Sequence, residues 1–382
     1  MMSVIVAEPG LSNVSVAHTE IGDVRGEEGF YQYRQYNAVS LARYRTFEEV
    51  WFLFVHGRLP EAYELDRFVN EVRSLRTIGD DLMSVIRVVA ATGGGRRPLI
   101  GLRTVMSSLA ELEGMAPLWD ADPDTRVRHA LRVCAVTPTI LAALHRISNG
   151  DEPVPARDDL DTAAHWLHTI TGELPTPEHA RAVEQYLIAT IDHGFNASTF
   201  TARVIASTGA DLVSAVCGAI GAFSGPLHGG APDRALDSLD EIALTGGAEA
   251  ATEWARGQMA AGARIMGFGH AVYRTVDPRS ELLRDIANGL GGDTVDLAVE
   301  VERAVVSELA RSHPDRPLYA NVEFYAGVVM DRCGIPRTMF TPTFTVSRVV
   351  GWCANILEQA QSRKIIRPRA TYVGPEVVEL VS

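Results

Sequence analysis

The sequence predicts an all-α protein, because helical patterns fill its interior and strand patterns are confined to its ends. Thr46-Phe-Glu-Glu49 has the spacing of a capping box, and apolar residues then recur every three or four positions as far as Phe54. Residues 99–112, 300–309 and 346–357 repeat this helical period. Weak strand patterns occur only at 3–7, 14–17 and 372–380. Because the interior of the sequence almost lacks the apolar–polar alternation of strands, it favours a fold of helices packed on helices.

Three of the four predicted helices have a recognisable beginning. The first follows the capping box, and the helix over 99–112 follows the Gly93-Gly94-Gly95 break. The helix over 346–357 is expected to begin after Thr341-Pro342. Loops are predicted at 92–98, 148–155, 225–232, 267–269, 289–293 and 333–343.

The composition excludes several classes of protein. A chain of 382 residues has room for two or three domains, and 46% hydrophobic with 22% charged residues is a globular balance. A net charge of -13 argues against a nucleic-acid partner. No signal peptide and no membrane span are predicted, so a cytoplasmic protein is expected. The four cysteines are scattered, which favours reduced, buried thiols and no metal site.

Two histidines stand in glycine-rich loops and are candidates for chemistry. His228 lies in Ser-Gly-Pro-Leu-His-Gly-Gly, and His270 lies in Gly-Phe-Gly-His-Ala-Val. Neighbouring glycines let a ligand approach the backbone and leave the imidazole unshielded. Either histidine taken alone could equally be a turn residue without a catalytic or binding function. The glycines before His270 do not form a dinucleotide fingerprint, since no strand precedes them.

Arginines and one carboxylate accompany these histidines. Guanidinium groups suit the bidentate capture of carboxylates and phosphates, and the candidates are Arg274, Arg279, Arg348, Arg367 and Arg369. Glu323, in Asn-Val-Glu-Phe-Tyr, is a candidate general base. The bland alternatives are surface arginines and an exposed glutamate at a helix start.

Several of these segments together resemble the citrate synthase family. The similar motifs are GFGHAVYRTVDPRS around His270, GPLHGGA around His228, DHGFNASTFTAR from Asp192, TFEEVWFLFVHGRLP from Thr46, and residues 342–351 with Ser347-Arg348. They occur in the family's order over nearly the whole chain, which makes the resemblance far more specific than any one motif.

The resemblance implies a fold and an assembly. A large helical domain is expected to comprise residues 1–229 and 335–382, with a smaller helical domain inserted at 230–334. Members of the family are homodimers whose substrates bind in the cleft between the two domains. Acetyl-CoA and oxaloacetate are the implied substrates, and no cofactor is implied, because acetyl-CoA is itself consumed.

The resemblance also implies roles for individual residues. His228 is expected to hydrogen-bond the thioester oxygen, His270 the carbonyl of oxaloacetate, and Glu323 to act as base. The expected oxaloacetate contacts are His193, Asn196, Arg279, Phe344 and Arg348, with Arg367 supplied by the partner subunit. The expected CoA contacts are Ile265, Met266, Gly267, Phe268, Gly269 and Arg274. The predicted helix start at Ala231-Pro232 favours a neutral His228 through its dipole.

The chain departs from the family pattern at the base. Glu323 stands where the family normally has aspartate, so the carboxylate is carried one methylene further from the backbone. A misplacement of about 1 Å can cost on the order of 100-fold in rate. Three explanations are open: the backbone is shifted so that the longer side chain fits, the enzyme is slow, or the substrate or task has changed. Lesser departures are Arg97, Ala271 and Ala320, where the family often has histidine, arginine and proline.

The leading prediction is therefore a citrate synthase, an acyltransferase that forms citrate and CoA. One alternative is a 2-methylcitrate synthase that uses propionyl-CoA, since one methylene discriminates by only ~1–3 kcal/mol. A second alternative is a metabolite-binding homologue with weak catalysis.

Overall fold

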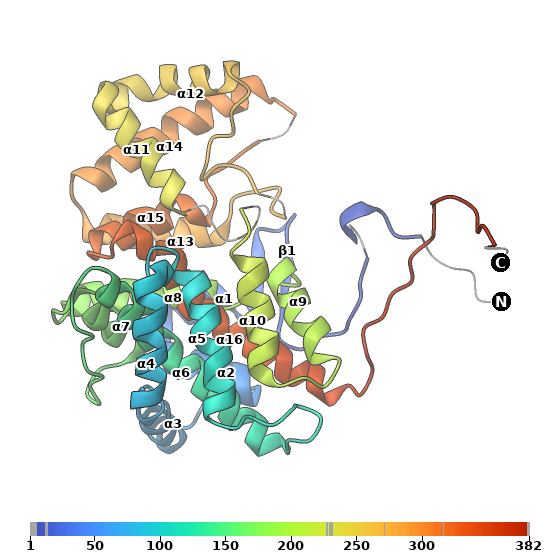
Figure 1. Ribbon diagram of the computed structural model, residues 1–382. Helices are drawn as coiled ribbons and strands as arrows, with labels where there is room; N and C mark the ends of the chain where they lie inside the picture. The colour runs from blue at the N-terminus through green and yellow to red at the C-terminus, as the bar shows by residue number, and fades with distance from the viewer. Residues whose placement is uncertain are drawn as a thin grey trace.

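The computed structural model is predominantly helical, which confirms the predicted all-α class. It describes residues 6–11, 14–226, 228, 232–270, 272–315 and 317–379, with the side chains of 232–234 left aside. Within these residues there are sixteen α-helices and one small sheet (Figure 1).

The helices follow one another through short connections. Their bounds are α1 Ala38–Tyr44, α2 Phe47–His56, α3 Ala62–Ser74, α4 Asp80–Val89, α5 Pro98–Leu112, α6 Pro123–Ser148, α7 Thr162–Thr171, α8 Pro177–Thr190, α9 Ala197–Ala206, α10 Leu212–Phe223, α11 Pro232–Thr245, α12 Ala251–Ala260, α13 Pro278–Leu290, α14 Asp293–Ser312, α15 Val322–Arg332 and α16 Phe340–Gln361. Short 3₁₀ segments occur at Pro9–Leu11, Gly247–Ala250 and Arg337–Met339, and a π-helical turn at Ala90–Gly94.

Many helices begin at a side chain that caps their first turn. Thr46 and Glu49 form the predicted capping box at the start of α2. Asparagine, aspartate or threonine side chains accept a backbone N–H at the starts of α1, α6, α7, α8, α9, α10, α13 and α15. Each such cap is worth about 1 kcal/mol. Two of them, Asn196 and Asn321, begin the helices that carry site residues.

Helix α16 is the central element of the body. It packs against α6, α8, α9 and α10, and its residues are buried along most of its length. The helix begins at Phe340, three residues before the predicted start after Thr341-Pro342, and Pro342 lies in its first turn. The first-turn N–H groups have no intrahelical partner, so proline is tolerated there.

Helix α6 is the one described helix that is long and apolar enough to cross a membrane by length and composition. Its mean hydropathy over the apolar window is 1.3, and 78% of that window is buried inside the protein. Such burial is typical of a core helix.

The strand predictions are wrong in position. Residues 6–7, 14–17 and 372–379 form no strands, and residues 3–5 and 380 lie outside the described part. The sheet instead consists of β1 Gly22–Arg25, β2 Phe30–Tyr33 and β3 Tyr36–Asn37, all antiparallel. Tyr31 and Tyr33 anchor it by donating their hydroxyls to the carbonyls of Ala189 and Ile188. Contacts distant in sequence therefore stabilise this hairpin.

Two groups of helices are visible in the chain. Helices α11, α12 and α14 gather at one end, and α13 and α15 lie between them and the main body (Figure 1). Both α13 and α15 contact α8 of the body, while α15 also contacts α11 and α14. The predicted domain limits at 230 and 334 stay a prediction, and residue 230 lies outside the described residues.

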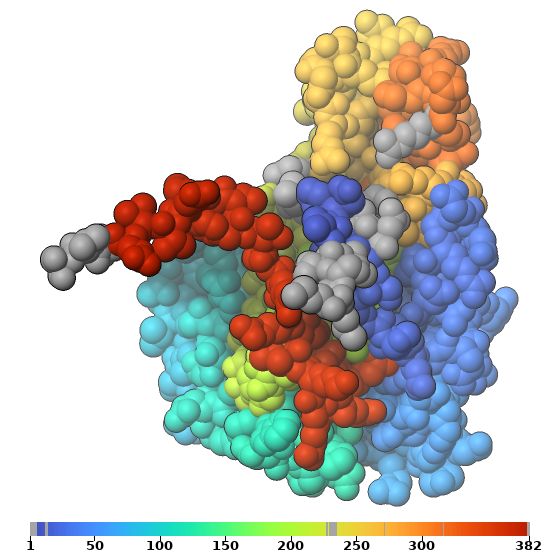
Figure 2. Space-filling model, turned by 90° about the vertical axis from the view of Figure 1, so that its right-hand side faces the viewer, coloured from blue at the N-terminus to red at the C-terminus, as the bar shows by residue number. Residues whose placement is uncertain are grey.

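The four cysteines are free thiols: Cys134, Cys333 and Cys353 are buried, and Cys217 is half-buried. Residues 363–379 have no regular structure, and their last part extends away from the body (Figures 1 and 2).

Candidate active site

A cleft of about 1060 Å³ brings most of the predicted site residues together. Its lining includes His228, His270 and Glu323, the predicted substrate contacts His193, Asn196, Arg279, Phe344 and Arg348, and the loop residues Ile265, Met266, Gly267, Phe268 and Gly269. These residues come from segments more than a hundred positions apart in the chain, so the fold assembles the site.

His228 follows α10 and is held by the first turn of α9. Its Nε2 lies 2.8 Å from the Ser198 hydroxyl and 3.3 Å from the Ser198 backbone nitrogen. A backbone N–H can only donate, which favours a neutral imidazole with its proton on Nδ1. Burial, aided by the charge of Arg348, lowers the pKa of His228 to about 4. The histidine is therefore a neutral hydrogen-bond donor at pH 7.

Ser198 is itself fixed by neighbouring groups. The Trp352 indole donates to the Ser198 hydroxyl oxygen at 3.1 Å, and Asn196 Oδ1 lies 2.8 Å from the same oxygen. The single hydroxyl hydrogen thus faces two acceptors, Asn196 and His228. Phe223 packs edge-on against the His228 ring, with centroids 5.2 Å apart. The imidazole is oriented on two sides by buried groups.

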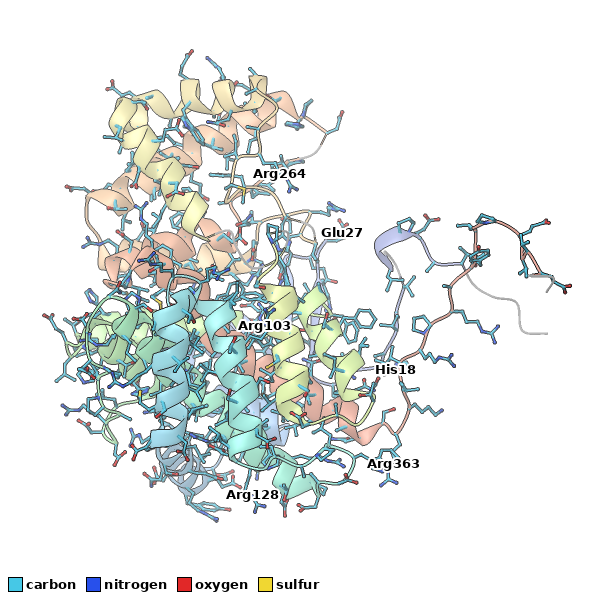
Figure 3. The ribbon with its side chains drawn as sticks, viewed as in Figure 1. His18, Glu27, Arg103, Arg128, Arg264 and Arg363 are labelled. Carbon is cyan, nitrogen blue, oxygen red and sulfur yellow. The ribbon has the colours of Figure 1, made fainter. Side chains whose placement is uncertain are left out.

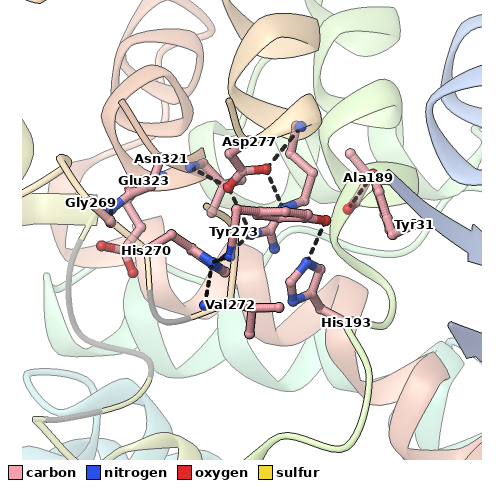
Figure 4. A network of polar contacts seen from close by, with 12 residues as sticks. Tyr31, Ala189, His193, Gly269, His270, Val272, Tyr273, Asp277, Asn321 and Glu323 are labelled. Atoms are coloured by element: carbon pink, nitrogen blue, oxygen red, sulfur yellow. Dashed lines mark hydrogen bonds and ion pairs between the residues drawn. The ribbon is translucent and has the colours of Figure 1, made fainter. Parts of the chain in front are cut away.

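His270 has the opposite tautomer. Its Nδ1 accepts hydrogen bonds from the backbone N–H groups of Val272 and Tyr273, each at 3.0 Å (Figure 4). A neutral ring must then carry its proton on Nε2. Burial and the nearby Arg279 lower the pKa of His270 to about 4. The Nε2 lies 3.2 Å from an Arg279 nitrogen, so two donors face one place where an oxygen acceptor would fit.

The glycines before His270 allow its loop to lie directly on α15. Gly267 and Gly269 have φ of 83° and 78°, which side chains rarely tolerate. A Cβ on Gly267 would also lie 3.1 Å from the Cβ of Phe324. Asn321 ties the loop down, donating its backbone N–H to Gly267 O and its side chain to Gly269 O, each at 2.8 Å.

Glu323 lies in the first turn of α15, directly beyond this attachment. Its backbone N–H donates to Asn321 Oδ1 at 3.0 Å, and its half-buried side chain lines the cleft. The same asparagine therefore positions both the His270 loop and the carboxylate. Ala320, which precedes Asn321, forms an antiparallel β-bridge with Phe268.

Two buried arginines supply positive charge, and they differ in their partners. Arg279 forms two hydrogen bonds with Asp277, at 3.0 and 2.8 Å. Arg348 donates through Nε to the Thr190 carbonyl at 2.9 Å, lies over the Phe344 ring, and has no ion pair with any described residue. A buried guanidinium without a carboxylate is costly unless a ligand supplies one. The cleft is thus suited to a small anion.

Asp192 is a buried carboxylate close enough to Arg348 for each side chain to affect the pKa of the other. It accepts hydrogen bonds from the Gly194 N–H and the Asn355 amide. Burial raises its pKa to about 6, against the opposing effect of Arg348. At pH 7 this carboxyl is still largely ionised, so its negative charge partly offsets the charge of Arg348, although the two side chains form no ion pair.

Two predicted residues lie elsewhere. Arg274 is exposed and lines a separate cavity of about 120 Å³, which also touches His270. Arg367 is exposed in the C-terminal segment after α16, outside the cleft lining of this chain.

Several residues of the site have no predicted role. Asp192, Tyr273 and Asp277 occur within the motifs named above, and each lies within two positions of a predicted site residue. Asn355, His313 and Arg264 also line the cleft. Arg264 is exposed on the loop after α12 (Figure 3), and only its place just before the glycine-rich loop signals it.

Comparison with known proteins identifies the family to which this chain is similar. The family model described as "Citrate synthase, C-terminal domain" matches residues 10–369. The citrate synthase of Deinococcus radiodurans is 37% identical over 370 residues, covering 96% of this chain and 95% of that protein. Citrate synthase 2 of Bacillus subtilis is 35% identical and covers 99% and 98%.

Solved structures agree with these relatives. The citrate synthase of Pyrobaculum aerophilum has a TM-score of 0.84 at 35% identity, covering 100% of this chain and 97% of that one. A ternary complex of the Thermoplasma acidophilum citrate synthase with carboxymethyl coenzyme A and oxaloacetate has a TM-score of 0.84 at 27% identity, covering 98% and 97%. The chain belongs to the citrate synthase family.

Proposed function

We propose that this chain condenses acetyl-CoA with oxaloacetate and water to give citrate and CoA. The observation that supports the proposal best is one cleft in which two neutral histidines, a carboxylate and two buried arginines converge. The related chain from Thermoplasma acidophilum, whose structure is described with oxaloacetate and a CoA analogue, supports the choice of substrates.

Oxaloacetate is proposed to bind between the two buried arginines. Arg348, which lacks a carboxylate partner among the described residues, takes one carboxylate, and Arg279 with His193 takes the other. Asn196 and Phe344 complete the walls of this part of the cleft. The Nε2–H of His270 donates to the ketone oxygen, in the place where it and Arg279 both point. Polarisation of that carbonyl makes its carbon the electrophile.

Acetyl-CoA is proposed to be activated between His228 and Glu323. A thioester methyl is a very weak acid, so a carboxylate base needs help from a donor at the oxygen that becomes the enol. The Nδ1–H of His228 supplies that donor, and Glu323 takes the methyl proton. The resulting carbon attacks the ketone carbon, and the new alkoxide receives the proton of His270. Hydrolysis of the citryl thioester then releases CoA.

The CoA portion is proposed to lie along residues 265–269 at the mouth of the cleft. Backbone groups of a glycine-rich loop let a ligand approach closely. Arg274 lines the adjoining smaller cavity, so its predicted contact with CoA requires the ligand to pass around the loop. Acetyl-CoA enters as a substrate, and the proposed chemistry calls for no further cofactor.

The proposal predicts CoA release that depends on oxaloacetate. Purified protein is mixed with acetyl-CoA, and free thiol is measured with and without oxaloacetate. Propionyl-CoA in a parallel reaction tests the 2-methylcitrate alternative, which the named relatives do not favour over citrate synthase. Tight oxaloacetate binding in calorimetry without thiol release would contradict the proposed catalysis and favour a metabolite-binding homologue.

We also propose that the chain acts as a homodimer in which Arg367 enters the partner's cleft. The C-terminal segment exposes large apolar side chains, among them Val373 and Val377 at 92% each, which a partner would cover. Arg367→Ala and His228→Ala are each expected to be nearly inactive alone. Unfolded and refolded together, they form mixed dimers with one intact cleft and regain activity. Failure of the mixture to exceed the sum of its parts would count against a shared site.

A further inference from the structure

We infer that Tyr273 is a positioning residue that orients the oxaloacetate-binding groups and fixes the tautomer of His193. The inference rests on the proposed function and adds to it a side chain with no assigned role. Tyr273 is buried, with 4% of its surface exposed, and it contacts His193 and His270 (Figure 4). Its ring also faces the Arg279 guanidinium.

The hydroxyl of Tyr273 meets His193. The oxygen lies 2.9 Å from His193 Nε2, and it is the one hydrogen bond that this hydroxyl makes with the described residues. Burial, with the positive charge of Arg279 adding to it, holds the pKa of His193 well below its usual range. The imidazole is therefore neutral, with one nitrogen that donates and one that accepts.

Only one direction of this hydrogen bond gives the buried phenol hydrogen an acceptor. If Tyr273 donates to Nε2, the His193 proton sits on Nδ1, where an acceptor bound in the cleft can receive it. If Nε2 donated instead, the phenol hydrogen would be buried without an acceptor among the described residues, which is unfavourable. Burial keeps the pKa of Tyr273 above its usual range, so the phenol stays protonated. Tyr273 thus presets Nδ1–H, a donor suited to a carboxylate in the cleft.

The ring and backbone of Tyr273 serve the other two groups. Its backbone N–H donates to His270 Nδ1, and its ring lies against the His270 ring, with centroids 4.9 Å apart and planes inclined by 32°. The Arg279 guanidinium carbon lies 5.8 Å from the centroid of the same ring. Removing the hydroxyl alone therefore affects His193 and leaves the contacts with His270 and Arg279 in place.

Tyr273→Phe is the direct test. The KM for oxaloacetate is expected to rise about tenfold, as for the loss of one well-placed hydrogen bond, while the KM for acetyl-CoA changes less than twofold. Tyr325→Phe is the matched control, because it removes a hydroxyl bonded to Glu302 outside the cleft lining. An unchanged KM for oxaloacetate in an active Tyr273→Phe enzyme would overturn the inference. Equal changes in both KM values would show a general structural role and overturn it too.

The tautomer gives a second readout that needs no active variant. Wild-type protein labelled with ¹⁵N-histidine is measured by long-range ¹H–¹⁵N correlation, with His193→Gln used only to assign the signal. A proton on Nδ1 is expected, and a proton on Nε2 would refute the assignment. If wild-type protein releases no CoA, the proposed function fails, yet this measurement still decides whether Tyr273 sets the tautomer.

Discussion

Glu323→Gln is expected to lower turnover by at least about 1000-fold, because the amide cannot accept the methyl proton of acetyl-CoA. General base catalysis typically contributes about 10²–10⁴-fold. Apart from Glu323, the described carboxylates of the cleft lining are the exposed Asp23 on β1 and the buried Asp192. Steady-state thiol release at saturating substrates measures the effect. Oxaloacetate binding by calorimetry should be nearly unchanged, since the arginines remain.

Glu323→Asp is the informative partner of that substitution. Aspartate keeps the base and shortens it by one methylene, to the residue that the family normally has at this position. We expect this variant to remain active or to improve. If Glu323→Gln retains the full rate, the assignment of the base is wrong. If Glu323→Asp is as inactive as Glu323→Gln, the backbone of α15 is adapted to the longer side chain.

The parts of the fold that could be predicted are those marked by neighbouring residues in the sequence. Capping residues and the apolar period identify helices such as α2 and α5 without any knowledge of their partners. The hairpin β1–β2 was missed because its strands have only four residues each and Gly-Asp-Val-Arg does not alternate clearly. Its stability comes from hydroxyls that reach Ala189 and Ile188 in α8, and sequence separation hides such contacts.

In the site, too, residues in recognisable motifs could be predicted, whereas roles that depend on tertiary contacts could not. The predicted site residues stand in motifs that could be compared with a family, and thirteen of these fifteen residues line one cleft. Asp277 and Tyr273 belong to the same motif as His270, but their tasks depend on tertiary contacts that the motif does not display. The separate cavity beside Arg274 likewise reflects the path of the loop, and residue type alone does not specify that path.

Asp277→Asn is expected to destabilise the protein by about 3–5 kcal/mol, because it leaves Arg279 as a buried charge without its partner. Both side chains are almost fully buried, at 3% and 2% exposure, and they are 2.8 Å apart. Urea unfolding followed by circular dichroism measures the loss. Asp240→Asn is the matched control, since the same substitution there breaks an exposed pair with Arg337 and should cost no more than about 1 kcal/mol.

Asp277 also joins the arginine to the helix that carries the base. Its Oδ2 accepts the backbone N–H of Val322, the first residue of α15, at 3.1 Å. Loss of the carboxylate is therefore expected to impair both oxaloacetate binding and proton abstraction. A purely local ion pair would raise the KM for oxaloacetate and leave kcat unchanged, and that result would contradict the proposed link.

A double variant separates stability from function at this pair. Replacing Asp277 by Leu and Arg279 by Met removes both charges, so no buried charge is left unpaired, and much of the lost stability should return. Activity should not return, because the substrate carboxylate has lost its guanidinium. A stable but inactive double variant would mean that the Asp277–Arg279 pair is retained for binding and for alignment of α15, while hydrophobic burial supplies the stability of the surrounding core. A double variant no more stable than Asp277→Asn would instead assign the pair a structural role.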